Sequence, residues 1–272
     1  MNETISLTFS SSVENHKGME IIGNQLAEGM TSKECYELAA RFPDCSEVIK
    51  LNDLLNGAVS DDIKKNIDEA VVLIFRNGVE NVLGLNTEEL YKEQTKLVYD
   101  KKMYAYGRVV NKHIRHNLCF ADFSQSSDFE NKKGTVVDFK DEKVKLTKAL
   151  RDRISEKIGG KCTNLFAEGN RYYDLNKTGI GWHSDSERTL VLCVRLGATF
   201  PIYFQWYHKN KTVGNHIKIN LNGGDIYIMS EKTVGRDWKK SSLYTLRHAA
   251  ALNEKLIFKK KKTEDKNEEK RK

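Results

Sequence analysis

Two residues that commonly bind metals, His183 and Asp185, stand two positions apart in the stretch Gly-Ile-Gly-Trp-His-Ser-Asp-Ser-Glu-Arg of residues 179–188. The stretch has a strand-like pattern, and residues i and i+2 of a strand point to the same side of the sheet. A neutral imidazole and a carboxylate on one side can bind the same ion, and a later histidine would complete a facial triad. Such a triad leaves metal positions open for a bidentate co-substrate and dioxygen. Because an isolated His-x-Asp pair is common, it needs support from other residues.

Composition limits the class of protein. A chain of 272 residues can form one large domain or two modest ones. The net charge of +7 suggests a polyanionic partner, although a basic surface also serves solubility. The five cysteines stand singly, as in reduced intracellular proteins. No apolar run reaches the roughly 20 residues of a membrane span, and residues 1–12 lack the pattern of a signal peptide. We expect a soluble, unsecreted protein of the cytoplasm or nucleus, with no membrane partner.

The N-terminal part shows an alternating pattern of elements. Residues 1–15 are polar without a sustained period and predict a flexible arm. Residues 16–100 predict a small α/β extension because helices and strands alternate. The helices follow Thr31, which has capping-box spacing, and Asn86, and a short polar helix lies at 61–69. The strands are expected at 48–51 and 70–75.

Strands dominate after residue 101. We expect a strand at 103–110 and an amphipathic helix at 146–158, followed by strands at 190–196, 202–207, 216–221, 225–229 and 243–248. Many short strands with turn residues between them predict a β-sandwich or barrel. No apolar residue follows Phe258, so residues 259–272 predict a charged, disordered tail.

Several motifs together resemble one family. The run Asn-Arg-Tyr-Tyr-Asp at 170–174, followed by the stretch at 179–187, closely resembles the AlkB-like Fe(II)- and 2-oxoglutarate-dependent dioxygenases. Leu-Gly-Ala at 196–198, Gly-Asp-Ile-Tyr-Ile-Met at 224–229 and Asp-Trp at 237–238 follow in the family's order. The resemblance covers roughly residues 100–261. It implies an α+β protein with a double-stranded β-helix (jelly-roll) core at 101–258 behind the N-terminal α/β extension.

The resemblance assigns the iron ligands. His183 and Asp185 take the positions of the first two. Many relatives carry the third ligand soon after the tryptophan, where this chain has Lys240, and a protonated amine is a poor ligand. His248, in Thr-Leu-Arg-His-Ala-Ala, is the later histidine that we favour. If His248 is instead an ordinary strand-end residue, the site has lost a ligand.

The resemblance also suggests how 2-oxoglutarate would be held. Asn170 and Tyr172 match the family's Asn-x-Tyr, and Tyr173 could substitute for Tyr172 because one extra residue precedes His183. Relatives bind the far carboxylate with an Arg-x-x-x-x-x-Arg strand, where this chain has Lys255 and Lys261. Lysine lacks the bidentate fork of arginine. Arg247 is the reserve candidate, and Lys255 could equally be a surface lysine.

The substrate implied by the resemblance is an N-alkylated base in nucleic acid. Glu187 stands where repair relatives place a carboxylate near the damaged base, and Arg108, Lys112 and Arg115 fall in the region that recognises the nucleotide. The expected reaction consumes 2-oxoglutarate and O2 and releases succinate, CO2 and formaldehyde. It needs a single strand or a flipped base of DNA or RNA, and we expect a monomer.

Two alternatives stay open from the sequence. The same core can hydroxylate a protein or a small molecule, since fold does not decide function. A catalytically dead nucleic-acid-binding relative is the other, because Lys240 stands where a ligand would be expected.

Overall fold

A computed structural model describes residues 2–258 of the protein. The tail predicted for residues 259–272, with Lys261, lies outside the described residues. The strands are β1 (Thr4–Ser10), β2 (Ser12–Glu14), β3 (Ile21–Gly23), β4 (Ser46–Lys50), β5 (Val71–Phe75), β6 (Lys102–Ala105), β7 (Arg108–Asn111), β8 (His116–Ala121), β9 (Val136–Asp138), β10 (Phe166–Tyr172), β11 (Gly179–His183), β12 (Val191–Gly197), β13 (Phe200–His208), β14 (Lys211–Leu221), β15 (Ile226–Met229) and β16 (Thr245–Ala251).

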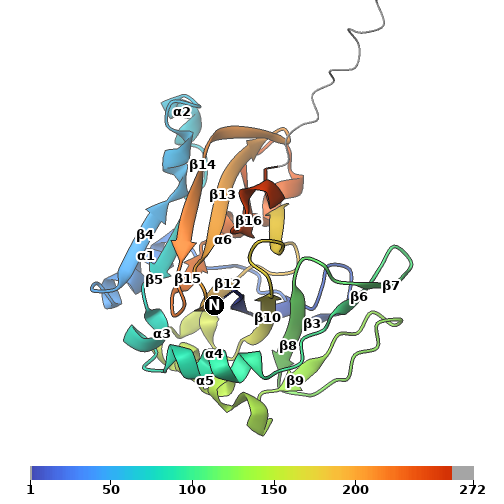
Figure 1. Cartoon of the computed structure of the whole chain (residues 1–272). Helices are drawn as coiled ribbons and strands as arrows, with labels where there is room; N and C mark the ends of the chain where they lie inside the picture. The colour runs from blue at the N-terminus through green and yellow to red at the C-terminus, as the bar shows by residue number, and fades with distance from the viewer. Residues whose placement is uncertain (1, 259–272) are drawn as a thin grey trace, which may run out of the picture.

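The helices are fewer and mostly short. The α-helices are α1 (Ser32–Arg41), α2 (Asp61–Lys64), α3 (Gly78–Asn81), α4 (Thr87–Thr95), α5 (Lys145–Lys157) and α6 (Glu231–Val234). Single 3₁₀ turns are η1 (Leu51–Leu55), η2 (Glu142–Val144), η3 (Gly160–Cys162), η4 (Arg236–Lys239) and η5 (Glu254–Leu256). The protein is therefore a mixed α/β structure built mainly from strands (Figure 1).

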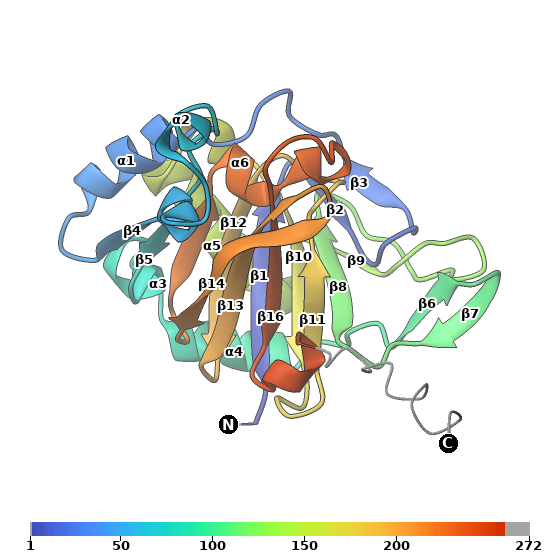
Figure 2. The same cartoon turned by 90° about the horizontal axis from the view of Figure 1, so that it is seen from above.

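Two sheets face each other. The larger has the order β4-β5-β15-β12-β1-β10-β8-β9 and is antiparallel except for the β8–β9 pair, and the smaller is β11-β16-β13-β14. The two layers lie one over the other in Figure 2. At one end they share an apolar cluster in which Val72 and Met229 of the large sheet pack with Phe204 and Trp206 of the small one. At the other end the facing side chains are polar, and this end contains the candidate site.

The helices cover the outer face of the large sheet. Leu38 of α1, Leu90 of α4 and Leu150 of α5 belong to the same buried cluster as Leu7 of β1 and Val194 of β12. The predicted caps of two helices are confirmed. Thr31 forms a reciprocal capping box with Glu34, and the Asn86 side chain accepts a hydrogen bond from the Glu89 N–H.

The prediction of a flexible arm at residues 1–15 is wrong. Residues 4–10 form β1, which pairs with β10 on one side and β12 on the other at the centre of the large sheet. Their sequence Thr-Ile-Ser-Leu-Thr-Phe-Ser alternates in period two, so it carries the signal of a half-apolar strand. Ile5, Leu7 and Phe9 face the helices and are fully buried, whereas Ser6 and Thr8 face the small sheet.

The region predicted as an α/β extension does not form a separate sheet. β4 pairs antiparallel with β5, and β5 pairs antiparallel with β15, so both strands continue the large sheet. The apolar run of β5 is buried on both faces: Leu73 packs under the helices and Ile74 between the sheets. A strand buried on both faces loses the alternating pattern that marks a half-exposed one.

Local departures from the predictions have local causes. The strand expected at 103–110 is a hairpin of β6 and β7, because Tyr106 and Gly107 both adopt positive φ in a two-residue turn. The helix expected at 61–69 ends after one turn at Lys64. The chain after Asn253 forms the 3₁₀ turn η5.

Within residues 2–258 no helix has the length and apolarity to cross a membrane. All five cysteines are free.

The buried position of β1 predicts a stability effect. Leu7→Ala should lower the free energy of unfolding by about 2–5 kcal/mol, because the truncation leaves a cavity under the helices. Val98→Ala, whose side chain is 84% exposed, should change it by less than about 0.5 kcal/mol. Urea unfolding of both variants measures the difference, and a neutral Leu7→Ala would restore the interpretation of a loose arm.

Candidate metal centre

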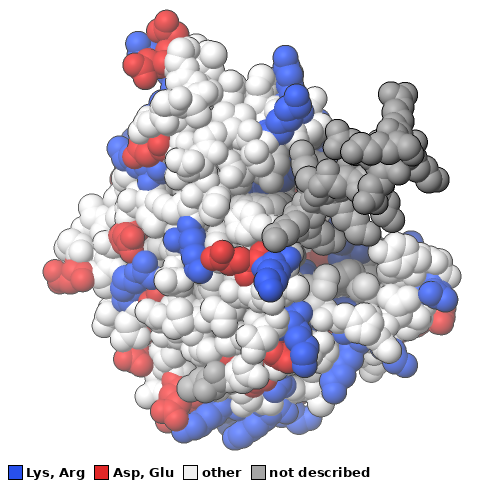
Figure 3. All heavy atoms as spheres, turned by 45° about the horizontal axis from the view of Figure 1, so that its top comes forward, with Lys and Arg blue, Asp and Glu red and all other residues white. Residues whose placement is uncertain are grey.

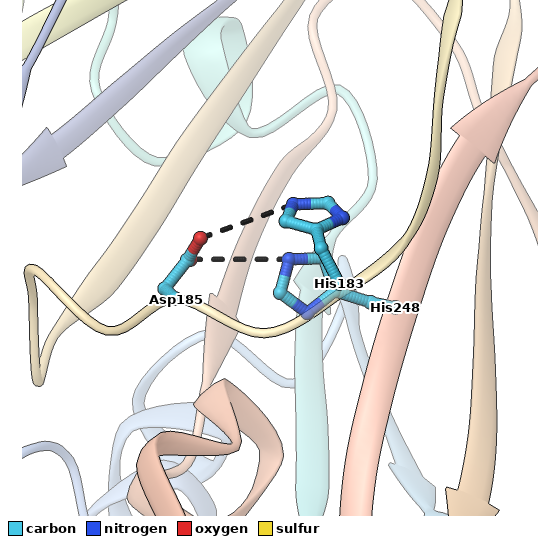
Figure 4. Close-up of side chains that lie close together, drawn as sticks. All are labelled: His183, Asp185 and His248. Carbon is cyan, nitrogen blue, oxygen red and sulfur yellow. Dashed lines mark ion pairs between the residues drawn. The ribbon is translucent and has the colours of Figure 1, made fainter. Parts of the chain in front are cut away.

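Three side chains converge at the polar end between the sheets. Ligand atoms of His183, Asp185 and His248 all lie within 4.8 Å of one another. The Nε2 atom of His183 is 3.9 Å from Asp185 Oδ1, and the Nε2 atom of His248 is 3.9 Å from Asp185 Oδ2 (Figure 4). These distances exceed a hydrogen bond. Since nitrogen and oxygen ligands bind a divalent metal at about 2.0–2.2 Å, one ion can bridge such a gap.

The small sheet positions the two imidazoles. His183 ends β11 and lies directly opposite His248 of β16 in the antiparallel register, with ring centroids 4.2 Å apart. Asp185 lies in the loop after β11 and not within the strand. Its backbone N–H donates a hydrogen bond to Val234 O over 3.4 Å. The expectation that one strand carries both residues therefore holds only for His183.

A glycine allows the chain around Asp185 to pack closely. Gly235 has a φ of +79°, and a Cβ there would lie 2.4 Å from Leu246 O and 2.9 Å from Ser184 Oγ. The Ser184 hydroxyl donates to that same Leu246 carbonyl over 2.8 Å. The turn after α6, the end of β11 and strand β16 are thereby held together behind the three ligands.

The protonation states suit metal binding. His183 Nδ1 lies 2.8 Å from Gly181 O. Because a carbonyl oxygen can only accept, the proton is on Nδ1, and the lone pair of Nε2 points toward Asp185. Burial lowers the pKa of His183 to about 3 and that of His248 to about 4, so both imidazoles are neutral near pH 7. Burial raises the pKa of Asp185 to about 6, which still leaves it ionised at neutral pH. The set offers two neutral nitrogens and one carboxylate.

Lys240 is not part of this group. It is exposed and lines a different hollow, near Met30 and Leu243. The sequence alternatives for the third ligand were His248 and Lys240, and the structure brings His248 beside His183 and Asp185.

The three residues lie in the wall of a cavity of about 300 Å³. Both sheets contribute to it: Asn170, Tyr172 and Arg195 come from the large sheet, and Ile202 and Ala250 from the small one. A volume of this size lies at the lower limit of ligand pockets, which span about 300–1,000 Å³.

A charged cluster borders the carboxylate end. Arg188 is buried and its Nη2 donates to Glu168 Oε2 over 2.7 Å, while its Nε donates to Glu187 Oε1 over 2.9 Å. The guanidinium lowers the pKa of Glu187 against the effect of burial. Glu187, predicted to contact the substrate, therefore lies in the cavity wall as an ionised acceptor.

The predicted co-substrate residues divide into two groups. Asn170 and Tyr172 line the cavity, and Asn170 Oδ1 accepts hydrogen bonds from Asn117 Nδ2 and Arg115 Nε. Tyr173 points away from it: the ring stacks on His116 and the hydroxyl donates to His113 O. Tyr172 rather than Tyr173 thus has access to a ligand.

Neither predicted cation reaches the cavity. Lys255 is exposed on η5. Arg247 precedes His248 on β16 and so faces the opposite side of the sheet. There it stacks 4.2 Å from the Tyr207 ring and donates to Asn210 Oδ1. Neither Lys255 nor Arg247 therefore lines the cavity.

The three basic residues predicted to bind substrate have different environments. Arg108 is exposed on the β6–β7 hairpin. Arg115 lines the cavity beside Asn170. Lys112 is buried, and its Nζ donates to Asn15 Oδ1 over 2.7 Å and to Asn117 Oδ1 over 2.8 Å. Lys112 thus joins the N-terminal segment to β8 and does not present its charge to a phosphate.

Several cavity residues were missed from the sequence. Glu14, from the segment predicted as a flexible arm, and His16 and Lys17, from the start of the predicted α/β extension, line the cavity. Arg195 and Glu168 were also missed, although Arg195 is a charged residue inside the run at 190–196 that otherwise reads as a buried strand. A charged residue in such a run is a signal that could have been used, because an ionised side chain is buried in a core only when a partner or a function stabilises it there.

Comparison with known proteins shows to which family this chain belongs. No protein-family model matches the chain. The chain is 40% identical over 256 residues to "Uncharacterized protein R156" of Acanthamoeba polyphaga mimivirus, and the alignment spans 93% of this chain and 97% of the relative. Such identity over nearly the whole of both chains means that this chain belongs to the family of the mimivirus protein. The relative's name assigns no activity, so the chemistry must be argued from the site.

A buried carboxyl group in the cavity wall leads us to expect that the stability of the protein depends on pH. Burial raises the pKa of Glu14 from 4.5 to about 7. Its contribution to stability is therefore complete below about pH 4.5 and is lost as the pH rises through about 7. Glu14→Gln, which stays neutral, should have a melting temperature near that of the wild type at pH 4.5 and above it at pH 8.

Thermal unfolding in the presence of a chelator measures this difference without interference from bound metal. The exposed Glu130 provides the control, because Glu130→Gln should change the melting temperature equally at both pH values. A constant difference for Glu14→Gln would contradict the pKa shift.

Proposed function

We propose that this protein is an AlkB-like Fe(II)- and 2-oxoglutarate-dependent dioxygenase that removes N-methyl groups from bases in nucleic acid. The observation that carries the proposal is the convergence of His183, Asp185 and His248 in the wall of a cavity between two facing sheets. Two histidines and one carboxylate are the donor set of iron oxygenases, which need further metal positions for co-substrate and dioxygen. We propose also that the two sheets correspond to the double-stranded β-helix, or jelly-roll, of that family.

The residues present fit an iron ion. His183 Nε2 and His248 Nε2 both face the Asp185 carboxylate without hydrogen bonding to it. The buried Nδ1 atom of His248 has no partner among residues 2–258, so the local structure does not commit its ring to another role. Bound Fe(II), with 2-oxoglutarate and O2, would supply the oxidation that hydroxylates an N-methyl carbon, after which formaldehyde is lost.

The chain's own residues have distinct tasks in this proposal. The Asn170 amide and the Tyr172 hydroxyl present hydrogen-bonding groups to the co-substrate. Glu187, kept ionised by Arg188, is an acceptor for a base that carries a donor or a positive charge. The sheets on either side bury much of the cavity wall, and the lower local dielectric strengthens these electrostatic contacts.

The β6–β7 hairpin is the best candidate for a contact with nucleic acid. It stands out from the body of the molecule in Figure 2. Tyr106, at its tip, is 94% exposed, and the exposed Arg108 follows the turn as the first residue of β7. An exposed aromatic ring close to a cation suits base stacking beside a phosphate backbone. Elsewhere charges of both signs are mixed, although Lys and Arg side chains gather along the lower edge of the face in Figure 3.

Substitution of the proposed third ligand tests the metal centre. His248→Ala should weaken binding of Mn(II), a stand-in for Fe(II), by more than about 100-fold, because loss of an outer partner alone costs 10–100-fold. Formation of succinate from 2-oxoglutarate should fall with it. Lys240→Ala should retain both, since Lys240 lies outside the cavity.

Electron paramagnetic resonance measures the bound Mn(II), and product analysis measures succinate and formaldehyde. Unchanged metal affinity in His248→Ala would remove it from the ligand set. If wild type consumes 2-oxoglutarate but releases no formaldehyde from oligonucleotides with N-methylated adenine or cytosine, the demethylase assignment fails and a protein or small-molecule substrate takes its place.

A second variant tests the nucleic-acid contact. Tyr106→Ala should weaken binding of a single-stranded oligonucleotide by about fivefold or more, because stacking of one base is worth about 1–3 kcal/mol. Tyr106→Phe keeps the ring and should bind as the wild type does. Fluorescence anisotropy at fixed salt measures both, and equal affinity for all three proteins would exclude the hairpin tip from the interface.

A further inference from the structure

One of the three arginines in the wall of this cavity, Arg195, has no ion-pair partner among residues 2–258. Arg195 of β12 is 2% exposed. Its Nε and Nη1 atoms have no hydrogen-bond partner among the described residues 2–258. The guanidinium carbon lies 5.4 Å from the centre of the Phe200 ring, which supports the cation from one side.

Arg188 provides a comparison, because carboxylates neutralise its charge in the same cavity. It lies in the same wall, but Glu168 and Glu187 both accept hydrogen bonds from it. Arg195 has no such carboxylate in the part of the chain that the structure describes. Burial of a guanidinium without a counter-charge is strongly unfavourable. A negatively charged ligand in the cavity would supply the missing counter-charge. The guanidinium is already desolvated and faces the cavity, so binding would add little further cost of burying it.

The residues around Arg195 suit an anion. Arg195 lies opposite Ser6 in the β1–β12 register, and Ser6 lies opposite Asn170 in the β1–β10 register, so the three form a row across one face of the sheet. Tyr172 and Tyr227 also line the cavity, close enough for the charge of Arg195 to act on the pKa of each phenol. A hydroxyl, an amide and two phenols supply donors.

The remaining wall suits a short carbon chain. Ile180, Ile202 and Ala250 line the cavity from the small sheet. Ala250 follows His248 by two residues on β16, so both face the same side. The cavity thus combines a metal-ligand group, an apolar wall and a buried arginine within about 300 Å³.

We infer that Arg195 binds the distal carboxylate of a small dicarboxylic 2-oxo acid whose other end reaches the His183, Asp185 and His248 group. Arg195 takes the task expected from Lys255, which is exposed and outside the cavity. A guanidinium offers a carboxylate two parallel hydrogen bonds, which an ammonium does not. The identity of the ligand as 2-oxoglutarate rests on the proposed function, whereas the preference for a carboxylate rests on Arg195.

Calorimetric titration of the full-length, Mn(II)-loaded protein without O2 tests the inference. Arg195→Met should weaken 2-oxoglutarate binding by about 30-fold or more, as expected for loss of one partner of a buried charge pair. Pyruvate has the same 2-oxo acid group without a second carboxylate, so its affinity should not change. Mn(II) affinity, read by paramagnetic resonance, should also stay the same, which separates a carboxylate contact from damage to the metal site.

Three further variants complete the test. Arg195→Lys, which keeps the charge but loses the fork, should lose less affinity for 2-oxoglutarate than Arg195→Met, and it serves if the latter does not fold. Lys255→Met examines the rejected candidate, and Arg153→Met, at an exposed position on α5, is the matched control. Both should bind as the wild type does. Full affinity in Arg195→Met, or a loss in Lys255→Met alone, overturns the inference.

The proposed function can fail separately. If the wild type binds Mn(II) but not 2-oxoglutarate, the co-substrate is wrong, and thermal stabilisation by glutarate or succinate then decides the role of Arg195. Stabilisation that is lost in Arg195→Met supports a carboxylate site. If no dicarboxylate stabilises the wild type, the inference is wrong.

Discussion

β1 carries isoleucine, leucine and phenylalanine on one face of the large sheet and threonine and serine on the other. Its neighbours follow the same division, because antiparallel pairing aligns their pleats. Val194 of β12 and Ala167 of β10 face the helices, while Arg195 and Asn170 face the small sheet. One face thus forms the core beneath α1, α4 and α5. The other is left free to line a polar cavity, and the candidate site depends on this separation.

The polar face is stabilised by pairs of buried groups. Lys112 joins Asn15 to Asn117, and Arg188 joins Glu168 to Glu187. Each of these cations has its acceptors within the chain, which is the condition for burying a charge without a large loss of stability. They hold the N-terminal segment and the loop after β11 against the sheet. Removing either cation would leave buried acceptor oxygens of its partners without this donor.

The small sheet supplies the other half of the site. The pairing of β11 with β16 places His183 opposite His248, although 64 residues of chain separate them along the sequence. The close packing at Gly235 brings the turn after α6 against the same strands. The cavity lies where the polar face of the large sheet meets these histidines. A possible metal-binding group and an arginine without an ion-pair partner among residues 2–258 therefore share one cavity, an arrangement suited to a ligand with two different ends.

The sequence by itself determined most of the strands and helices after residue 30, and it identified His183, Asp185, His248, Asn170 and Glu187 as candidates. Local patterns were sufficient there, because capping residues and apolar periods act within a few positions along the chain. The alternation in β1 was equally local and was misinterpreted as a loose arm. The choices of Tyr172 over Tyr173 and of His248 over Lys240 were decided by tertiary structure. So was the rejection of Lys255. Which face of a strand meets a cavity, and which charges find partners, depends on pairing between distant segments, and no local pattern contains that information.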